Sequence, residues 1–148
     1  MRFIVLTGLS GAGKSQALSF LEDYGFYCVD NMPAALIPDF ARLALSSDGQ
    51  YENVALVTDI RAGIDIGKVL PVLEEILGDK SMLQIVYLEA STQCIVNRYK
   101  ETRHKHPLAP DGAGIFEAIE TERRQLEEIR GHADYIIDST YLDRKSVV

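Results

Sequence analysis

A glycine-rich octapeptide directly after a short apolar run constrains this sequence most. The run Phe3–Thr7, FIVLT, is followed by Gly8–Ser15, GLSGAGKS. This spacing matches the pattern G-x-x-x-x-G-K-[ST], in which a buried strand ends in a loop whose main-chain N–H groups surround one anion. A helix that begins near Lys14 adds the positive end of its dipole. The sequence therefore predicts a phosphate-binding loop between a strand and a helix, and we call Gly8–Ser15 the glycine-rich loop.

The same motif assigns chemical roles within the glycine-rich loop. Lys14 would contact the β- and γ-phosphates of a nucleotide, and the hydroxyl of Ser15 would bind the Mg²⁺ that accompanies ATP or GTP. A glycine-rich turn with an exposed lysine is the structural alternative, but a predicted strand before it and helix after it favour a nucleotide. The candidate nucleotide-binding residues are Gly8, Leu9, Ser10, Gly11, Ala12, Gly13, Lys14 and Ser15.

Short apolar runs alternate with segments of helical periodicity along the whole chain. The predicted strands are RFIVLTG, FYCVD, VALVTD, LQIVYLEA and ADYIID. Such alternation predicts an α/β fold with three layers, the P-loop NTPase type, in which helices cover both faces of a five-stranded parallel sheet. We expect the strand order 2-3-1-4-5 that similar P-loop kinases show, with the first strand in the centre.

The last long helical segment is IFEAIETERRQLEEIR, which predicts one continuous amphipathic helix. One side of this helix carries four aliphatic residues, Ile115, Ile119, Leu126 and Ile129. We expect that side to pack on the sheet. The fifth predicted strand follows, and Asp138 at its end is predicted to be a turn acid.

Composition limits the class of protein and its partners. The chain has 148 residues, of which 47% are hydrophobic, which fits one domain over residues 1–148. Its net charge of −7 argues against a general polyanion-binding surface, so RNA is not an expected partner. The opening apolar run is far shorter than the roughly 20 residues of a membrane span, and the two cysteines fall outside any CxxC pattern. We expect a cytoplasmic protein without a membrane segment, and the oligomeric state stays open, a homo-oligomer included.

Two acidic residues end predicted strands, at the edge where open parallel sheets bind their ligands. Asp59 ends VALVTD, in the place of a Walker B aspartate, and is therefore a metal candidate together with Ser15. Asp30 ends FYCVD and, with Asn31, stands where small-molecule kinases hold the phosphate acceptor or where a second-shell acid lies. Either aspartate could instead be a helix cap or a turn residue.

An isolated basic segment, RYKETRHKHPL, separates the fourth strand from the last long helix. This is the position of the lid that brings arginines onto the transferred phosphate in small kinases. We expect Arg103 in that role, so that Lys14, Asp59 and Arg103 are the catalytic candidates. The alternative is a solvated helix end whose cations complement the helix dipole.

Taken together, GLSGAGKS, DNMP, TDIRAG and RYKETRHKHPL resemble the RapZ-like family, also called RNase adapter or YvcJ-type nucleotide-binding proteins, over essentially the whole chain. The resemblance implies a P-loop domain that binds ATP and GTP and hydrolyses them slowly. By position it assigns Gly8–Ser15 to ATP and Asp59, Ile60, Arg61 and Ala62 to GTP, although Asp59 could equally be the Walker B acid. It also implies a C-terminal domain, absent from these 148 residues, to which RNA binding belongs.

Two functional hypotheses follow. The first is a regulatory nucleotide-binding module with weak ATPase or GTPase activity, whose bound nucleotide sets the conformation of a partner domain. The alternative is a small-molecule or nucleotide kinase that transfers the γ-phosphate to an acceptor near Asp30. No glutamine or glutamate stands beside Asp59 to order an attacking water, which favours slow turnover and the first hypothesis.

Overall fold

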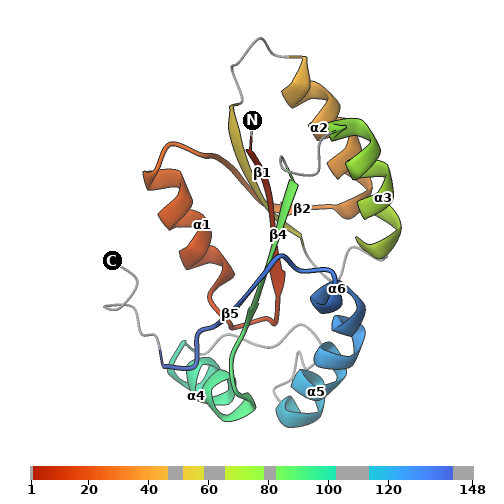
Figure 1. Ribbon diagram of the computed structural model, residues 1–148. Helices are drawn as coiled ribbons and strands as arrows, with labels where there is room; N and C mark the ends of the chain where they lie inside the picture. Colours follow the sequence, from red (N-terminus) through yellow and green to blue (C-terminus); the bar gives the residue numbers. More distant parts are fainter. Residues whose placement is uncertain (1, 47–51, 59–65, 79–82, 103–113, 142–148) are drawn as a thin grey trace.

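The structure is a computed structural model that describes residues 2–46, 52–58, 66–78, 83–102 and 114–141. Its strands are β1 Arg2–Gly8, β2 Tyr27–Met32, β3 Asn53–Thr58, β4 Leu83–Glu89 and β5 Tyr135–Asp138. They form one parallel sheet in the order β2-β3-β1-β4-β5 (Figure 1). The predicted fold class, strand order and central first strand are therefore confirmed.

Strand β1 is central because it is apolar on both faces. All of its residues from Phe3 to Gly8 are buried, and it pairs in parallel with β3 on one side and β4 on the other. Successive side chains point to opposite faces of a strand, so Phe3 and Val5 serve one hydrophobic cluster while Ile4 and Leu6 serve another. A strand buried in this way needs helices on both sides of the sheet.

The helices provide those two covers. Their bounds are α1 Lys14–Asp23, the 3₁₀ turn η1 Ala34–Leu36, α2 Ile37–Leu45, α3 Ile66–Leu77, α4 Thr92–Thr102, α5 Ile115–Gln125 and α6 Glu127–Gly131. Figure 1 shows α1 on one side of the sheet and α2, α3 and α6 on the other. Helices α4 and α5 lie near the end of the sheet where β1 and β4 end. None of the described helices is long and apolar enough to cross a bilayer.

The predicted continuous helix over the last long helical segment is wrong, because α5 and α6 are separate helices. Leu126 joins them with φ −98° and ψ 1°, outside helical values, although its N–H still donates to the carbonyl of Glu122 at 3.0 Å. The bend keeps both Leu126 and Ile129 buried in the core. The aliphatic residues therefore stay on the core side, although the helix axis changes direction at Leu126.

Strand β5 departs from the expectation of a sheet covered on both faces. Tyr135, Ile136 and Ile137 are 55%, 45% and 42% exposed, whereas the central strand is buried throughout. Strand β5 lies at the edge of the described sheet, where it pairs with β4. Because Asp138 accepts hydrogen bonds from the N–H and hydroxyl of Thr140, its prediction as a turn acid is confirmed.

Candidate functional site

The glycine-rich loop joins the end of β1 to the start of α1, as predicted from its motif. Gly8 is the last residue of β1, and Lys14 is the first residue of α1. Between them, Leu9 and Ala12 are fully buried and belong to the hydrophobic core. These two side chains fasten the loop to the body of the domain and leave its main chain at the end of the sheet that also carries α4 and α5 (Figure 1).

Gly8, Gly11 and Gly13 of this loop all have positive φ values, and the need for glycine is clearest at Gly8 and Gly13. Gly8 has φ +137°, and a Cβ atom placed on it would lie 2.1 Å from the carbonyl oxygen of Leu88 on β4. Gly13 has φ +102°, a left-handed value, and it is the residue that precedes the first turn of α1. The first glycine therefore permits close packing of two strands, and the second permits the reversal that starts the helix.

Hydrogen-bond donors gather where the loop enters α1. Among the described residues, the main-chain N–H groups of Gly11, Gly13 and Ser15 have no acceptor. The Lys14 ammonium group lies 2.8 Å from the carbonyl oxygen of Gly8, which folds this side chain back over the loop. Uncommitted N–H groups at a helix start, together with an ammonium group, form a site suited to an anion such as phosphate.

Helix α5 contributes a buried carboxylate to this loop. Oε1 of Glu122 accepts a hydrogen bond from the main-chain N–H of Ser10 at 2.8 Å, and Oε2 accepts one from the Ser10 hydroxyl at 2.6 Å. The sequence prediction missed Glu122. A signal was present, because Glu122 falls between Ile119 and Leu126 on the aliphatic side of the segment.

The carbonyl groups of the next two loop residues, Gly11 and Ala12, also accept hydrogen bonds from side chains distant in the sequence. Nη1 of Arg98, on α4, donates to the carbonyl oxygen of Gly11 at 2.9 Å. The hydroxyl of Ser139, just after β5, donates to the carbonyl oxygen of Ala12 at 2.7 Å, and Arg98 donates to that same hydroxyl oxygen at 3.1 Å. Arg98 belongs to the basic segment predicted to act as a lid, but here it supports the loop's main chain.

The predicted acceptor residues lie at the end of β2 and are exposed. Strand β2 continues past Asp30 to Met32, two residues beyond the predicted strand end. Asn31 has φ +56°, and the pairing with β3 shifts register between Val29 and Met32. A left-handed asparagine beside an exposed aspartate is a local irregularity of the kind that collects at ligand sites.

Several predicted site residues lie outside the described residues. These are Asp59, Ile60, Arg61, Ala62 and Arg103. Thr58, the buried last residue of β3, directly precedes Asp59 in the chain. Ser15, the other metal candidate, is the exposed second residue of α1. No group of three or more metal-ligating side chains occurs within the described part of the chain.

Burial and charge act together on one tyrosine close to this end of the sheet. Tyr87 on β4 is only 2% exposed. Burial, reinforced by the negative charges of Glu89 and Glu122, raises the pKa of Tyr87 to about 12. Its hydroxyl is therefore protonated at neutral pH and is not a base for phosphate chemistry.

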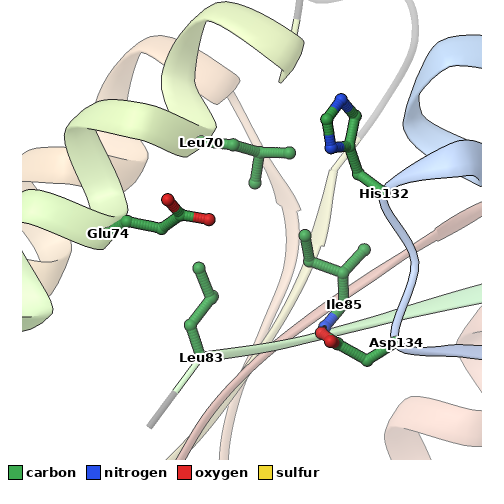
Figure 2. A pocket seen from close by; sticks show the side chains of 6 residues that line it. All are labelled: Leu70, Glu74, Leu83, Ile85, His132 and Asp134. Atoms are coloured by element: carbon green, nitrogen blue, oxygen red, sulfur yellow. The ribbon is translucent and has the colours of Figure 1, made fainter. Parts of the chain in front are cut away.

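A small cavity lies at the other end of the sheet, where β4 begins. Figure 2 shows its six lining residues, Leu70, Glu74, Leu83, Ile85, His132 and Asp134. Asp134 is already engaged, because its carboxylate accepts a hydrogen bond from the N–H of Ile85 at 2.8 Å. The cavity measures about 110 Å³, whereas pockets for drug-sized ligands measure about 300–1,000 Å³. It is therefore too small to hold a nucleotide.

Comparison with known sequences identifies relatives over most of the chain. The sequence profile of the RapZ-like N-terminal domain matches residues 1–148. A nucleotide-binding protein of Ruminiclostridium cellulolyticum is 48% identical over 142 residues, which cover 96% of this chain and 48% of that protein. A nucleotide-binding protein of Desulforudis audaxviator is 50% identical over 139 residues, with 94% and 47% covered. The chain spans about half the length of the curated relatives it matches.

Solved structures with a similar fold include small-molecule kinases. Shikimate kinase from Bacteroides thetaiotaomicron aligns with a TM-score of 0.59 and 19% identity, over 99% of this chain and 92% of that one. A gluconokinase from Sinorhizobium meliloti 1021 aligns with a TM-score of 0.54 and 18% identity, over 93% and 82%. Identities this low establish a shared P-loop kinase-like fold and nothing finer.

Proposed function

Because the chain belongs to the family defined by the RapZ-like N-terminal domain, we propose that it is a regulatory module that binds ATP and GTP on its glycine-rich loop. The observation that carries this proposal is the loop itself. Its N–H groups at Gly11, Gly13 and Ser15 have no acceptor among the described residues, and the Lys14 side chain folds over the same loop. In a chain of net charge −7, this local concentration of donors favours a strongly anionic ligand such as a triphosphate.

The position of Ser15 is compatible with a bound Mg²⁺ ion. The hydroxyl of Ser15 is exposed on the first turn of α1, next to the N–H groups proposed for the phosphates. Ser15 would hold the ion directly, and Asp59 would orient it or its water. When bound, Mg²⁺ would neutralise charge on the β- and γ-phosphates. Lys14 would orient the same phosphates from its position over the loop.

Turnover by this site should be slow. Hydrolysis needs a group that positions the attacking water, and neither glutamine nor glutamate follows Asp59 in TDIRAG. Arg103 is the cation proposed to stabilise charge on the transferred phosphate, and it belongs to the basic segment and not to the glycine-rich loop. We therefore expect one hydrolysis event to take on the order of minutes or longer, whereas kinases turn over at roughly 1–100 s⁻¹. Asp59, Ile60, Arg61 and Ala62 are proposed to add contacts to GTP.

A kinase is the second candidate function, and one observation favours it. Asp30 is exposed at the end of β2, beside the left-handed Asn31 and a shift in strand register. In small-molecule kinases of this fold, the phosphate acceptor would lie at this edge of the sheet. A kinase and a regulatory module differ in whether one acceptor molecule accelerates consumption of the nucleotide.

The relatives' greater length bears on what the module regulates. They are about twice as long as this chain, and we propose that the bound nucleotide acts on the remainder of such a protein. The nucleotide would then be a signal and not a consumed substrate, which agrees with slow turnover.

Calorimetric titration with ATP and GTP in the presence of Mg²⁺ tests nucleotide binding. Lys14→Ala should weaken binding at least about tenfold, because charge-assisted hydrogen bonds to phosphate are lost. Arg42→Ala is the matched control, since it removes an exposed cation whose neighbour is Asp39 on α2. Equal affinity in Lys14→Ala and wild-type protein would contradict the assignment of the loop.

Phosphate release decides between the two candidate functions. Release should be measured with ATP and GTP, with and without EDTA, and then with nucleosides, sugars and sugar phosphates as acceptors. Slow release that needs Mg²⁺ and ignores acceptors supports a regulatory module. Fast turnover confined to one acceptor would establish a kinase in its place.

A further inference from the structure

A buried carboxylate on α5 holds the third residue of the glycine-rich loop. Glu122 is 0% exposed. Its two oxygens accept hydrogen bonds from the main-chain N–H and from the hydroxyl of Ser10, at 2.8 Å and 2.6 Å. Ser10 is therefore held through its main chain and its side chain by one residue that lies 112 positions further along the sequence.

Packing alone does not account for a carboxylate at this position. A charged group loses its hydration on burial, and that loss is offset only where the group is well paired. Ile119, Leu126 and Ile129 are buried aliphatic residues on the same side of α5 and α6. A leucine at position 122 would continue this row without the cost of burying a charge. The hydrogen bonds to Ser10 are contacts that a leucine at this position could not make.

The residues after Ser10 are those whose N–H groups matter for a phosphate. Gly11 and Gly13 have φ values of +84° and +102°, and glycine loses more conformational freedom than any other residue when it is ordered. A loop that is already ordered pays less of that entropy when its ligand binds. By binding Ser10, Glu122 fixes the position at which the main chain of Gly11–Gly13 begins.

We propose that Glu122 is a positioning residue of the nucleotide site, which fixes Ser10 so that the N–H groups of Gly11 and Gly13 are arranged before the phosphate arrives. This inference rests on the proposed function, since it requires phosphate to bind this loop. Glu122 acts through Ser10 and does not touch the nucleotide. Its loss should therefore weaken binding of every nucleotide that carries phosphates on the loop, whatever the base.

Three variants test this role. Glu122→Leu removes both hydrogen bonds and restores the aliphatic row, so it should fold with a thermal midpoint at least equal to that of wild-type protein. It should bind Mg²⁺–ATP and Mg²⁺–GTP about tenfold more weakly, the effect of leaving one further residue to be ordered on binding. Glu122→Gln keeps an acceptor for the Ser10 N–H and should show an intermediate loss. Glu117→Gln, an exposed change on the same helix, should bind as wild type does.

Amide hydrogen exchange of the nucleotide-free protein gives a readout that does not require a nucleotide. In Glu122→Leu, exchange should accelerate across residues 9–13 and stay unchanged in β1. Unchanged exchange in residues 9–13 overturns the positioning role, whether or not wild-type protein binds ATP. Faster exchange there, in a protein whose wild type binds neither ATP nor GTP, supports positioning of the loop by Glu122 and contradicts the proposed function.

The binding results have equally definite meanings. A folded Glu122→Leu variant with wild-type affinity for both nucleotides overturns the inference. If that variant does not fold, Glu122→Gln decides, because it preserves the shape of the side chain. Weaker binding by folded Glu122→Gln supports the inference, and wild-type affinity refutes it.

Discussion

Replacement of Gly8 by alanine should destabilise the whole domain, because this residue of β1 packs directly against the main chain of β4. The added Cβ atom would lie 2.1 Å from the carbonyl oxygen of Leu88 and 2.7 Å from its nitrogen. Both atoms belong to the main chain, so no side chain can rotate away to make room. The N–H of Leu9 also donates to the carbonyl of Leu88 at 3.0 Å, which ties the two strands together at this point.

Two costs add in Gly8→Ala. A non-glycine residue held at φ +137° is strained by about 1–3 kcal/mol. Forcing a methyl group into a closed contact between two strands costs about 1–3 kcal/mol more, since either β1 or β4 must move. We therefore expect the free energy of unfolding to fall by about 2–6 kcal/mol, a large share of the roughly 5–15 kcal/mol of a typical domain.

Urea unfolding followed by circular dichroism measures this loss. Gly131→Ala is the matched control, because a Cβ atom on Gly131 meets nothing within 4 Å and Gly131 ends helix α6. That variant should stay within about 1 kcal/mol of wild type, the range of glycine-to-alanine changes in helices. A Gly8→Ala protein whose unfolding free energy lies within about 1 kcal/mol of wild type would refute the close approach of the two strands.

Two further predictions concern the basic segment and the buried tyrosine. Arg103→Ala should lower the rate of phosphate release more than it lowers affinity for ATP, since a lid arginine acts mainly on the transition state; equal losses in rate and affinity, with Arg42→Ala as control, would argue against a lid. The pKa of Tyr87 is raised from 10.0 to about 12, first by burial and then by Glu89 and Glu122. Because the folded pKa exceeds the unfolded one, this contribution to stability is complete below pH 10 and is lost as the pH rises towards 12. Urea unfolding of Tyr87→Phe between pH 8 and pH 11 should show a shallower alkaline loss than wild type, and an identical slope would refute this.

The strands could be predicted because the signals that specify them are local, whereas their order was expected from similar P-loop kinases. The apolar run of β1 ends at Gly8, the glycine-rich motif follows, and each later apolar run is separated from the next by a helical segment. A parallel sheet with a buried central strand is the arrangement that such a pattern permits. The cap of α4 is equally local, since the hydroxyl of Ser91, the residue before that helix, accepts the N–H of Cys94 at 3.2 Å.

The supports of the glycine-rich loop could not be predicted in this way. Periodicity placed Glu122 beside aliphatic residues but gave no information on its partner Ser10, which lies in another element. Arg98 was one of several cations in the basic segment, and no pattern in the sequence marks Ser139. The irregular end of β2 was missed for a related reason, because the register shift between Val29 and Met32 belongs to the pairing with β3, which is distant in the sequence.

The three supports of the glycine-rich loop also determine when the loop can become ordered during synthesis. Their partners lie 87, 112 and 127 positions further along the chain, at Arg98, Glu122 and Ser139. A nascent chain that has emerged only as far as β4 already contains the complete motif but has none of these three contacts. The last of these contacts can therefore form only after β5 has been made, and a nucleotide bound on the loop would stabilise the finished domain in preference to its precursors.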